Sequence, residues 1–418
     1  MNGRAIRLTV RDPDLGRSRL TVGFRLILVI PHLFWLAGWL SLATLVAIAN
    51  WIATLIQGYP APMLHRFLAA YVRYAAHVAS YVLLAADPYP SFTGRAGYPV
   101  DVDIDAPGRQ NRWVTGFRLI LAVPAILLAD TLVGFGSTAA GGWTGSAGVA
   151  ATAAFLGWFY CIVHGRMAEG LRNLVVYGIG YSAQMYGYLF LLTERYPNSD
   201  PAVYESANAY RADPIRVTVS DDLRRSRLTV FFRLLLAIPH LVWLTLWGIA
   251  VFFALIANWF ATLFGGAPPR GLHDFLSAYL RYQTHVFAFV QLVANPFPGF
   301  TGRAGTYPVD VEIDGPERQN RWVTGFRLFL AFPAFAILGA LATAAYLAAV
   351  YSWFHGLFRA EVPRGLRNLG AFQLRYQAQV YGYLYLLTDR YPYSGPQAGW
   401  QMTLTPAPPA APATPQPA

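Results

Sequence analysis

The sequence has no lysine, a single cysteine and few charged residues. Only 13% of its 418 residues are charged, about half of the share in soluble domains, which argues against a soluble globular protein and favours a surface that largely faces lipid. The lone Cys161 excludes an intramolecular disulfide framework and a cysteine-based metal site. All 32 basic residues are therefore arginines, and the formal net charge is +11. Because the arginines border apolar runs, this charge favours anionic lipid headgroups as partners and argues against nucleic acid.

Motifs of known enzyme classes are also missing. The sequence contains no G-x-S-x-G, H-E-x-x-H, P-loop or dinucleotide fingerprint. Four histidines have no second ligand at metal spacing within their segments, and we interpret them as ordinary interfacial side chains: His77, His164, His285 and His355. We therefore expect no enzymatic activity, no cofactor and no metal site.

One sequence device occurs four times. An arginine stands at the mouth of a long apolar run and a proline follows six residues later, at Arg25/Pro31, Arg118/Pro124, Arg233/Pro239 and Arg327/Pro333. The copies predict four repeat units, residues 1–97, 98–200, 201–305 and 306–395, and then a Pro/Ala-rich tail, 396–418, that we expect to be disordered. Units one and three match each other, as do units two and four, which indicates that a two-unit block was duplicated.

Each unit opens with a short alternating stretch and continues into the apolar run. Residues 5–10, 99–104, 215–219 and 308–313 have the period of two that is typical of strands. A strand that lies alone leaves backbone groups unpaired, so we expect the four to pair in a small sheet outside the bilayer.

The apolar run is too long for one straight span. In the first unit it covers residues 21–57, roughly 55 Å as a helix, against about 30 Å for the hydrocarbon core. The arginine precedes a tryptophan by 26 residues in three units (Arg25 to Trp51, for example), but by 40 in the second unit, where residues 134–145 are rich in glycine. We therefore predict a transmembrane helical hairpin in each unit, with a lengthened tip in the second.

The distribution of arginine orients these predicted hairpins. The central tips have none, whereas the entry and exit segments are arginine-rich. The positive-inside rule then places the open ends, and both termini of the chain, in the cytoplasm, and makes the protein a multi-pass protein of the plasma membrane.

A third segment closes each unit, and in the fourth unit its apolar positions advance by three or four. We expect an amphipathic helix that lies in the cytoplasmic interface or packs beneath the hairpins, with a third span as the alternative. The predicted fold is thus a predominantly α-helical polytopic membrane protein of four strand, hairpin and amphipathic-helix units.

Two sets of polar residues are candidates for function. The repeated arginines, Arg25, Arg118, Arg233 and Arg327, can anchor the protein through lipid phosphates or form a specific headgroup or anion site. In a hairpin, His32 and Asn50, like their copies His240 and Asn258, would face each other near mid-bilayer. They would form an interhelical hydrogen bond there or line a proton or ion pathway.

Particular motifs carry a family resemblance. The S-R-L-T-V-x-F-R-L-x-L-x-I-P-H stretches at Ser18 and Ser226, and Y-L-x-L-L-T-[DE]-R-Y-P at Tyr188 and Tyr383, resemble an uncharacterised, tandemly repeated membrane-domain family of bacteria, common in actinobacteria. The resemblance implies a membrane repeat protein but no activity.

Two functions follow as hypotheses. The first is a non-enzymatic membrane scaffold that binds anionic lipid, a protein partner or a second copy of itself through an arginine-rich cytoplasmic face. The second is a transporter or channel that uses the His/Asn pairs.

Overall fold

The structure is a computed structural model that describes residues 5–11, 14–134, 147–201 and 213–396. This part of the chain is mostly helical, and the predicted tail lies almost wholly outside it. In the first half the elements are β1 (Ile6–Val10), α1 (Arg19–Leu28), α2 (Ile30–Gln57), α3 (Pro62–Val82), β2 (Val100–Ile104), α4 (Arg112–Gly116), α5 (Arg118–Val133), α6 (Val149–His164) and α7 (Glu169–Leu189). In the second half they are β3 (Ile215–Val219), α8 (Arg227–Gly265), α9 (Arg270–Val290), β4 (Val309–Ile313), α10 (Arg321–Arg359) and α11 (Arg364–Leu384).

The apolar runs form long helices, so the predicted hairpins are wrong. Each of α8 and α10 is one helix of 39 residues, with its proline inside, and α2 follows α1 after Val29 alone. The middle of these runs contains only isolated glycines such as Gly248, which lower helix propensity without ending the helix. The comparison of the run's length with the thickness of the hydrocarbon core excludes a straight helix only if that helix is parallel to the membrane normal.

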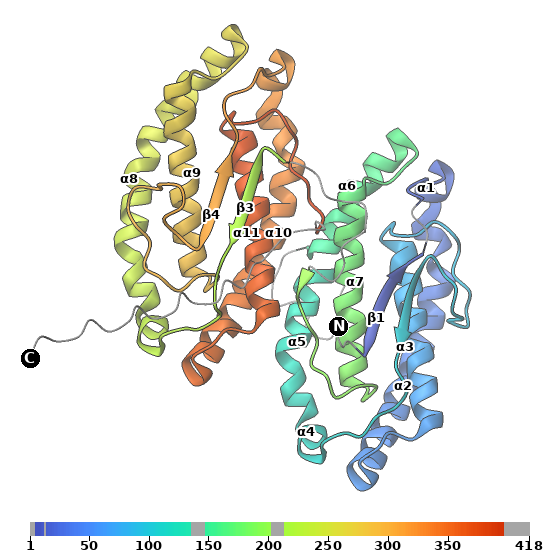
Figure 1. Cartoon of the computed structure of the whole chain (residues 1–418). Coiled ribbons are helices and arrows are strands. Elements are labelled where there is room, and N and C mark those ends of the chain that lie inside the picture. Colours follow the sequence, from blue (N-terminus) through green and yellow to red (C-terminus); the bar gives the residue numbers. More distant parts are fainter. Residues whose placement is uncertain (1–4, 12–13, 135–146, 202–212, 397–418) are drawn as a thin grey trace, which may run out of the picture.

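The predicted lengthened tip of unit two lies outside the described residues, but the helices on either side of it, α5 and α6, do not form a hairpin. The helix α5 ends at Gly134 and α6 begins after Gly148, and the backbones of these two glycines lie against each other. Arg118 at the start of α5 contacts the end of α7, whereas Cys161 of α6 contacts Met167 just before α7. Together α5 and α6 therefore take the place of one long helix beside α7 (Figure 1).

Short polar residues determine where the long helices begin. Ser18 and Ser226 accept a hydrogen bond from the amide three residues later, and Asn111 and Asn320 accept from the amides two and three residues later. These are N-cap interactions, which satisfy amides that have no partner within the helix. The S-R-L-T and N-R-W-V sequences are thus helix-start signals.

Tryptophan side chains tie together the two antiparallel long helices of each half. The indole of Trp51 donates to Thr115 O, and that of Trp158 donates to Val22 O. The second half repeats both bonds through Trp259 and Trp353. The tryptophan that follows the repeated arginine, by 26 residues in three units and by 40 in the second, therefore makes a contact between helices in every unit.

The shorter helices form a middle layer between the long helices and the strands. The four shorter helices are α3, α7, α9 and α11, and each packs on the long helix of its own unit. Most residues of α7 and α11 are buried. The structure shows the predicted amphipathic segments packed against the long helices.

The strands pair within each half, not across all four units as expected. β1 pairs antiparallel with β2, and β3 with β4, so there are two separate two-stranded sheets. One sheet covers α3 and α7, and the other covers α9 and α11 (Figure 1). The two-unit half is thus the complete structural unit, and the halves join where α10 packs on α5 and α6.

Three of the described helices, α2, α8 and α10, are long and apolar enough to cross a membrane. Their exposed side chains are predominantly large and apolar. Both observations support a membrane protein.

Candidate functional site

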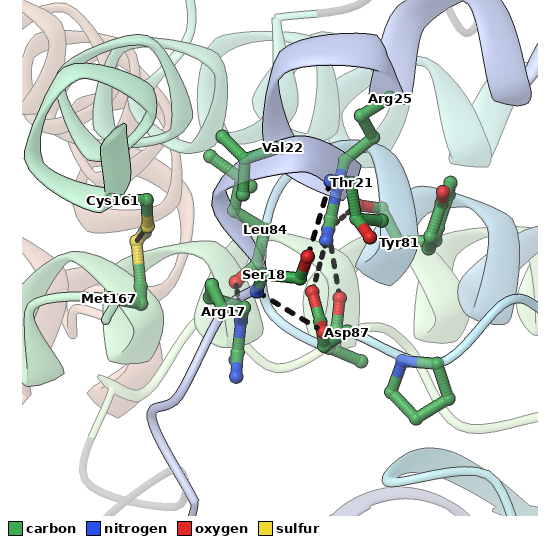
Figure 2. A network of polar contacts seen from close by, with 12 residues as sticks. Arg17, Ser18, Thr21, Val22, Arg25, Tyr81, Leu84, Asp87, Cys161 and Met167 are labelled. Carbon is green, nitrogen blue, oxygen red and sulfur yellow. Dashed lines mark hydrogen bonds and ion pairs between the residues drawn. The ribbon is translucent and has the colours of Figure 1, made fainter. Parts of the chain in front are cut away.

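The four repeated arginines form the same buried contact in every unit, and we call them the clamp arginines. Arg25, in Figure 2, donates through Nη1 to Tyr81 O and Ala86 O, at 2.5 and 2.9 Å, where α3 ends. Its guanidinium carbon lies 4.4 Å from the centre of the Tyr81 ring. A cation at a helix C-terminus interacts favourably with the free carbonyls and the helix dipole. Arg118, Arg233 and Arg327 repeat this geometry at the ends of α7, α9 and α11.

The second guanidinium nitrogen of each clamp arginine has a side-chain partner that varies among the units. Nη2 of Arg25 lies 2.6 Å from Asp87 Oδ1, and Nη2 of Arg233 lies 3.2 Å from Asn295 Oδ1. Arg118 uses Gln110, and Arg327 uses both Gln319 and Asp389. The carbonyl contacts are thus common to all units, whereas a negatively charged partner is not.

The turn that the clamp holds is a strained one. A leucine with positive φ, between 58° and 64°, follows each shorter helix: Leu84, Leu191, Leu292 and Leu386. Such a conformation costs about 1–3 kcal/mol for a residue other than glycine and persists where surrounding contacts impose it. A second buried side chain binds the leucine carbonyl in each unit, namely Arg17, Gln110, Arg225 or Gln319. The clamp and this second side chain together impose the turn.

Burial changes the role that we assign to the clamp arginines. Each is only 1–2% exposed, and its Nη1 and Nη2 atoms donate to protein acceptors. The headgroup hypothesis requires that the clamp arginines can reach lipid phosphates, and in this structure their burial prevents such a contact. Their contacts support a structural role at the helix ends.

The His/Asn pairs predicted to face each other lie far apart. His32 and Asn50 are on one face of α2, separated by 18 residues, or about 27 Å along the helix. Nδ1 of His32 is 2.7 Å from the Tyr74 hydroxyl, and Asn50 donates to Phe190 O at 3.2 Å. Each therefore makes the interhelical hydrogen bond that buried polar groups require, but with a partner other than the one predicted.

The second half repeats these bonds at the copied positions. His240 bonds Tyr282, and Asn258 bonds Tyr385 O. In neither half does a histidine meet an asparagine.

A pair of buried His–Asp contacts was missed in the sequence. Nε2 of His77, on α3, lies 2.9 Å from Oδ1 of Asp101, which is fully buried on β2. Burial alone raises the pKa of the Asp101 carboxyl, but hydrogen bonds from the amides of Gly97 and Val102 and from His77 outweigh it, so the pKa lies below its usual value. Burial lowers the pKa of His77, so a neutral imidazole donates to the carboxylate.

The same contact joins His285 to Asp310 in the second half, at 3.1 Å. Histidine and aspartate stand 24 or 25 residues apart in the two halves, and this recurrence is the signal that sequence reasoning could have used. The contact fastens the sheet of each half to its helix layer. The structure shows no group of three metal-ligating side chains within the described residues.

Another set of arginines lies at the ends of the long helices, and we call these the end arginines: Arg19, Arg112, Arg227 and Arg321. Each donates one Nη2 hydrogen bond to a carbonyl in the last turn of the antiparallel neighbour, at 2.8–3.2 Å. All four are exposed, and each adjoins an exposed apolar residue, such as Leu228 or Trp322. The end arginines therefore border the apolar surface, as a headgroup contact requires.

An apolar cavity of about 390 Å³ lies among α2, α3 and α7. Its walls include Leu36, Tyr71, Ala75, Ala79 and Ile179. At the position of Ala79 the second half has Phe287. The wall of this cavity therefore has a small side chain where the second half has a large aromatic one.

The fold and these contacts define a helical membrane protein built by duplication of a strand-and-long-helix unit, without a recognisable catalytic centre in the described residues. The family model described as Domain of unknown function (DUF4389) matches residues 19–94, 227–301 and 321–394. Because the matches cover more than half of the chain, the protein belongs to this family. The matched segments correspond to units one, three and four. No curated protein and no solved structure matches the chain.

Proposed function

We propose that the protein is a non-enzymatic membrane scaffold that binds anionic lipid headgroups through its end arginines. The observation that supports the proposal is the position of Arg19, Arg112, Arg227 and Arg321, exposed and adjacent to large apolar side chains. An arginine in this position can hold its stem in the apolar layer and direct its guanidinium to phosphate. The clamp arginines, in contrast, have a structural role in this proposal.

The cytoplasmic leaflet of the plasma membrane is the surface that we propose for this contact. It contains anionic lipids, and each arginine near it contributes about 1 kcal/mol to the attraction. The balance of 32 basic to 21 acidic residues agrees with this choice.

A double substitution tests the proposal. Arg227→Gln with Arg321→Gln removes two end arginines, and Arg7→Gln with Arg216→Gln removes the same charge from the strands. The readout is the preference of the reconstituted protein for spin-labelled phosphatidylglycerol over phosphatidylcholine. At about 1 kcal/mol each, loss of two end arginines should lower this preference roughly 30-fold, and high salt should lower it in wild type.

The strand-face control should keep the preference of wild type. An equal loss in both double variants would show that only net charge matters, and no loss in the end-arginine variant would refute the proposal. Protection of Cys161 from thiol reagents, since Cys161 is buried, verifies that each variant is folded.

The transporter or channel hypothesis gains no support from the described residues. Its His/Asn pairs are separated by five helical turns, and each side chain is engaged with another helix or with the end of one.

A further inference from the structure

The exposed apolar surface of the long helices extends over their whole length. On α8 it begins at Leu228, which is 70% exposed, and ends at Phe264, which is 72% exposed. These residues are 36 positions apart, or about 54 Å along the helix axis. Exposed leucine, isoleucine and phenylalanine side chains occur throughout the interval.

This length does not fit a helix that crosses the bilayer. The hydrocarbon core is about 30 Å thick, and a tilt of about 40°, at the upper end of what transmembrane helices show, lengthens the path to about 39 Å. About 15 Å of apolar surface would then remain in water or among headgroups. A helix that lies along the membrane surface has no such restriction on its length.

The end arginines give a second, independent argument. Because the long helices of a half are antiparallel, Arg227 lies at one end of the pair and Arg321 at the other, each bound to the end of its neighbour. In a crossing orientation these arginines would stand on opposite sides of the membrane, against the positive-inside bias. With the helices in the membrane plane, both ends meet the headgroups of the same leaflet.

The position of the sheets is the third argument. Arg73, near the middle of α3, donates to Val102 O of β2, and the neighbouring Tyr71 and Tyr74 pack on Trp39, near the middle of the α1–α2 run. The sheet is therefore level with the midpoint of the long helices. In a crossing orientation, a two-stranded sheet with open edges and exposed ion pairs such as Arg7–Asp105 would lie at hydrocarbon depth, where unpaired backbone groups are not tolerated.

From these observations we infer that the long helices lie in the plane of the membrane and that their apolar layer is embedded in one leaflet. The occupant of the apolar surface is the acyl-chain region of that leaflet, the shorter helices form the middle layer, and the sheets face water. The protein is then monotopic, in place of the multi-pass topology expected from the sequence. The first and third arguments concern the apolar layer and the sheets, so they stand without the proposed headgroup preference.

Depth measurements along one helix test the inference. Single cysteines replace Leu228, Leu246 and Phe264 in a Cys161→Ser background. These three exposed residues are spaced by 18 positions, or five turns, and so share one face of α8. A fourth cysteine replaces Thr218, which is exposed on β3. The full-length protein is spin-labelled and reconstituted into phosphatidylcholine vesicles, with and without phosphatidylglycerol, and depth is read from accessibility to oxygen and to a water-soluble nickel chelate.

The in-plane arrangement predicts that all three α8 labels lie at similar depth, about 5–10 Å below the headgroup boundary, and that the label at residue 218 is in water. A crossing helix would place the label at residue 246 near the bilayer centre, with those at residues 228 and 264 in opposite interfaces and residue 218 shielded from nickel. That profile would overturn the inference. A flat profile that is the same without phosphatidylglycerol would support it even if the proposed headgroup preference fails.

Discussion

Replacement of Arg25 by methionine should open the turn after α3. The side chain of Arg25 is buried, and its guanidinium binds Tyr81 O, Ala86 O and Asp87. Methionine has a similar length but no hydrogen-bond donor. The substitution therefore keeps most of the packing while it removes three hydrogen bonds.

The expected loss of stability follows from two opposing terms. Hydrogen bonds to a charged group contribute about 1.5–3 kcal/mol each, so the three together contribute roughly 4–9 kcal/mol. The variant no longer has to desolvate a guanidinium, which costs several kcal/mol. Tyr81 O also keeps its bond from the Leu84 amide. A net loss of about 3 kcal/mol remains.

The only cysteine provides the assay. Cys161 is buried in one cluster with Val22, Leu84 and Met167, beside the clamp (Figure 2). A thiol reagent reaches it only when this cluster opens. At 1.4 kcal/mol for each tenfold change, a loss of 3 kcal/mol should accelerate labelling of the reconstituted protein about 100-fold.

Unit three supplies the matched control. It has Asn295 where unit one has Asp87, and the asparagine still accepts from its clamp arginine. Asp87→Asn should therefore change the labelling rate less than about fivefold, a cost of under 1 kcal/mol. If Arg25→Met labels at the wild-type rate, or if Asp87→Asn matches it, the carbonyl contacts do not stabilise the turn as described.

Three further predictions concern other parts of the fold. The pKa of Asp101 is lower in the folded state than in the unfolded chain, so its stabilisation is complete above about pH 4 and is lost as the pH falls through the folded-state value. Asp101→Asn should flatten this acid dependence of the free energy of unfolding, measured by circular dichroism at a series of pH values, and an unchanged profile would contradict the assignment. Ala79→Phe introduces the side chain that the second half has at Phe287. The larger side chain should partly fill the apolar cavity and raise the free energy of unfolding by about 1 kcal/mol. A decrease of more than about 1 kcal/mol would instead indicate overpacking. Asn50→Ala should cost about 1 kcal/mol through the lost bond to Phe190 O, and a stability equal to wild type would show that this bond contributes nothing.

Much of this architecture is predictable from the sequence because repetition makes it visible. The copied arginines, the strands with period two and the duplication of a two-unit block all have counterparts in the structure. The residues that start the long helices are also recognisable, since Ser18 and Asn111 are typical N-cap residues.

The burial of the clamp arginines was harder to predict. Their main acceptors are backbone carbonyls, which every residue has, so no residue type marks them. A constant separation of 62 residues between each arginine and its Asp or Asn partner recurs in three units. That recurrence was the available signal, and in unit two Gln110 replaces the distant partner.

Whether the long helices cross the membrane or lie along it does not follow from the sequence, for a physical reason. Composition reports that a run is apolar, but not whether it stands across the bilayer or along it. The prediction of hairpins assumed the first arrangement. The two sets of contacts that argue against it, the end arginines and the sheets level with Trp39, depend on neighbours distant in the sequence.

The pairing of strands within each half also has a consequence for synthesis on the ribosome. β1 emerges first, yet its partner β2 follows about 90 residues later, roughly 5–20 seconds at usual rates of translation. The hydrogen-bond partners of Asn50 and Arg19, which are Phe190 and Val163, are synthesised later still. Until the second unit is made, the first unit therefore has no partner for β1, and the half is the smallest piece in which both strands are paired.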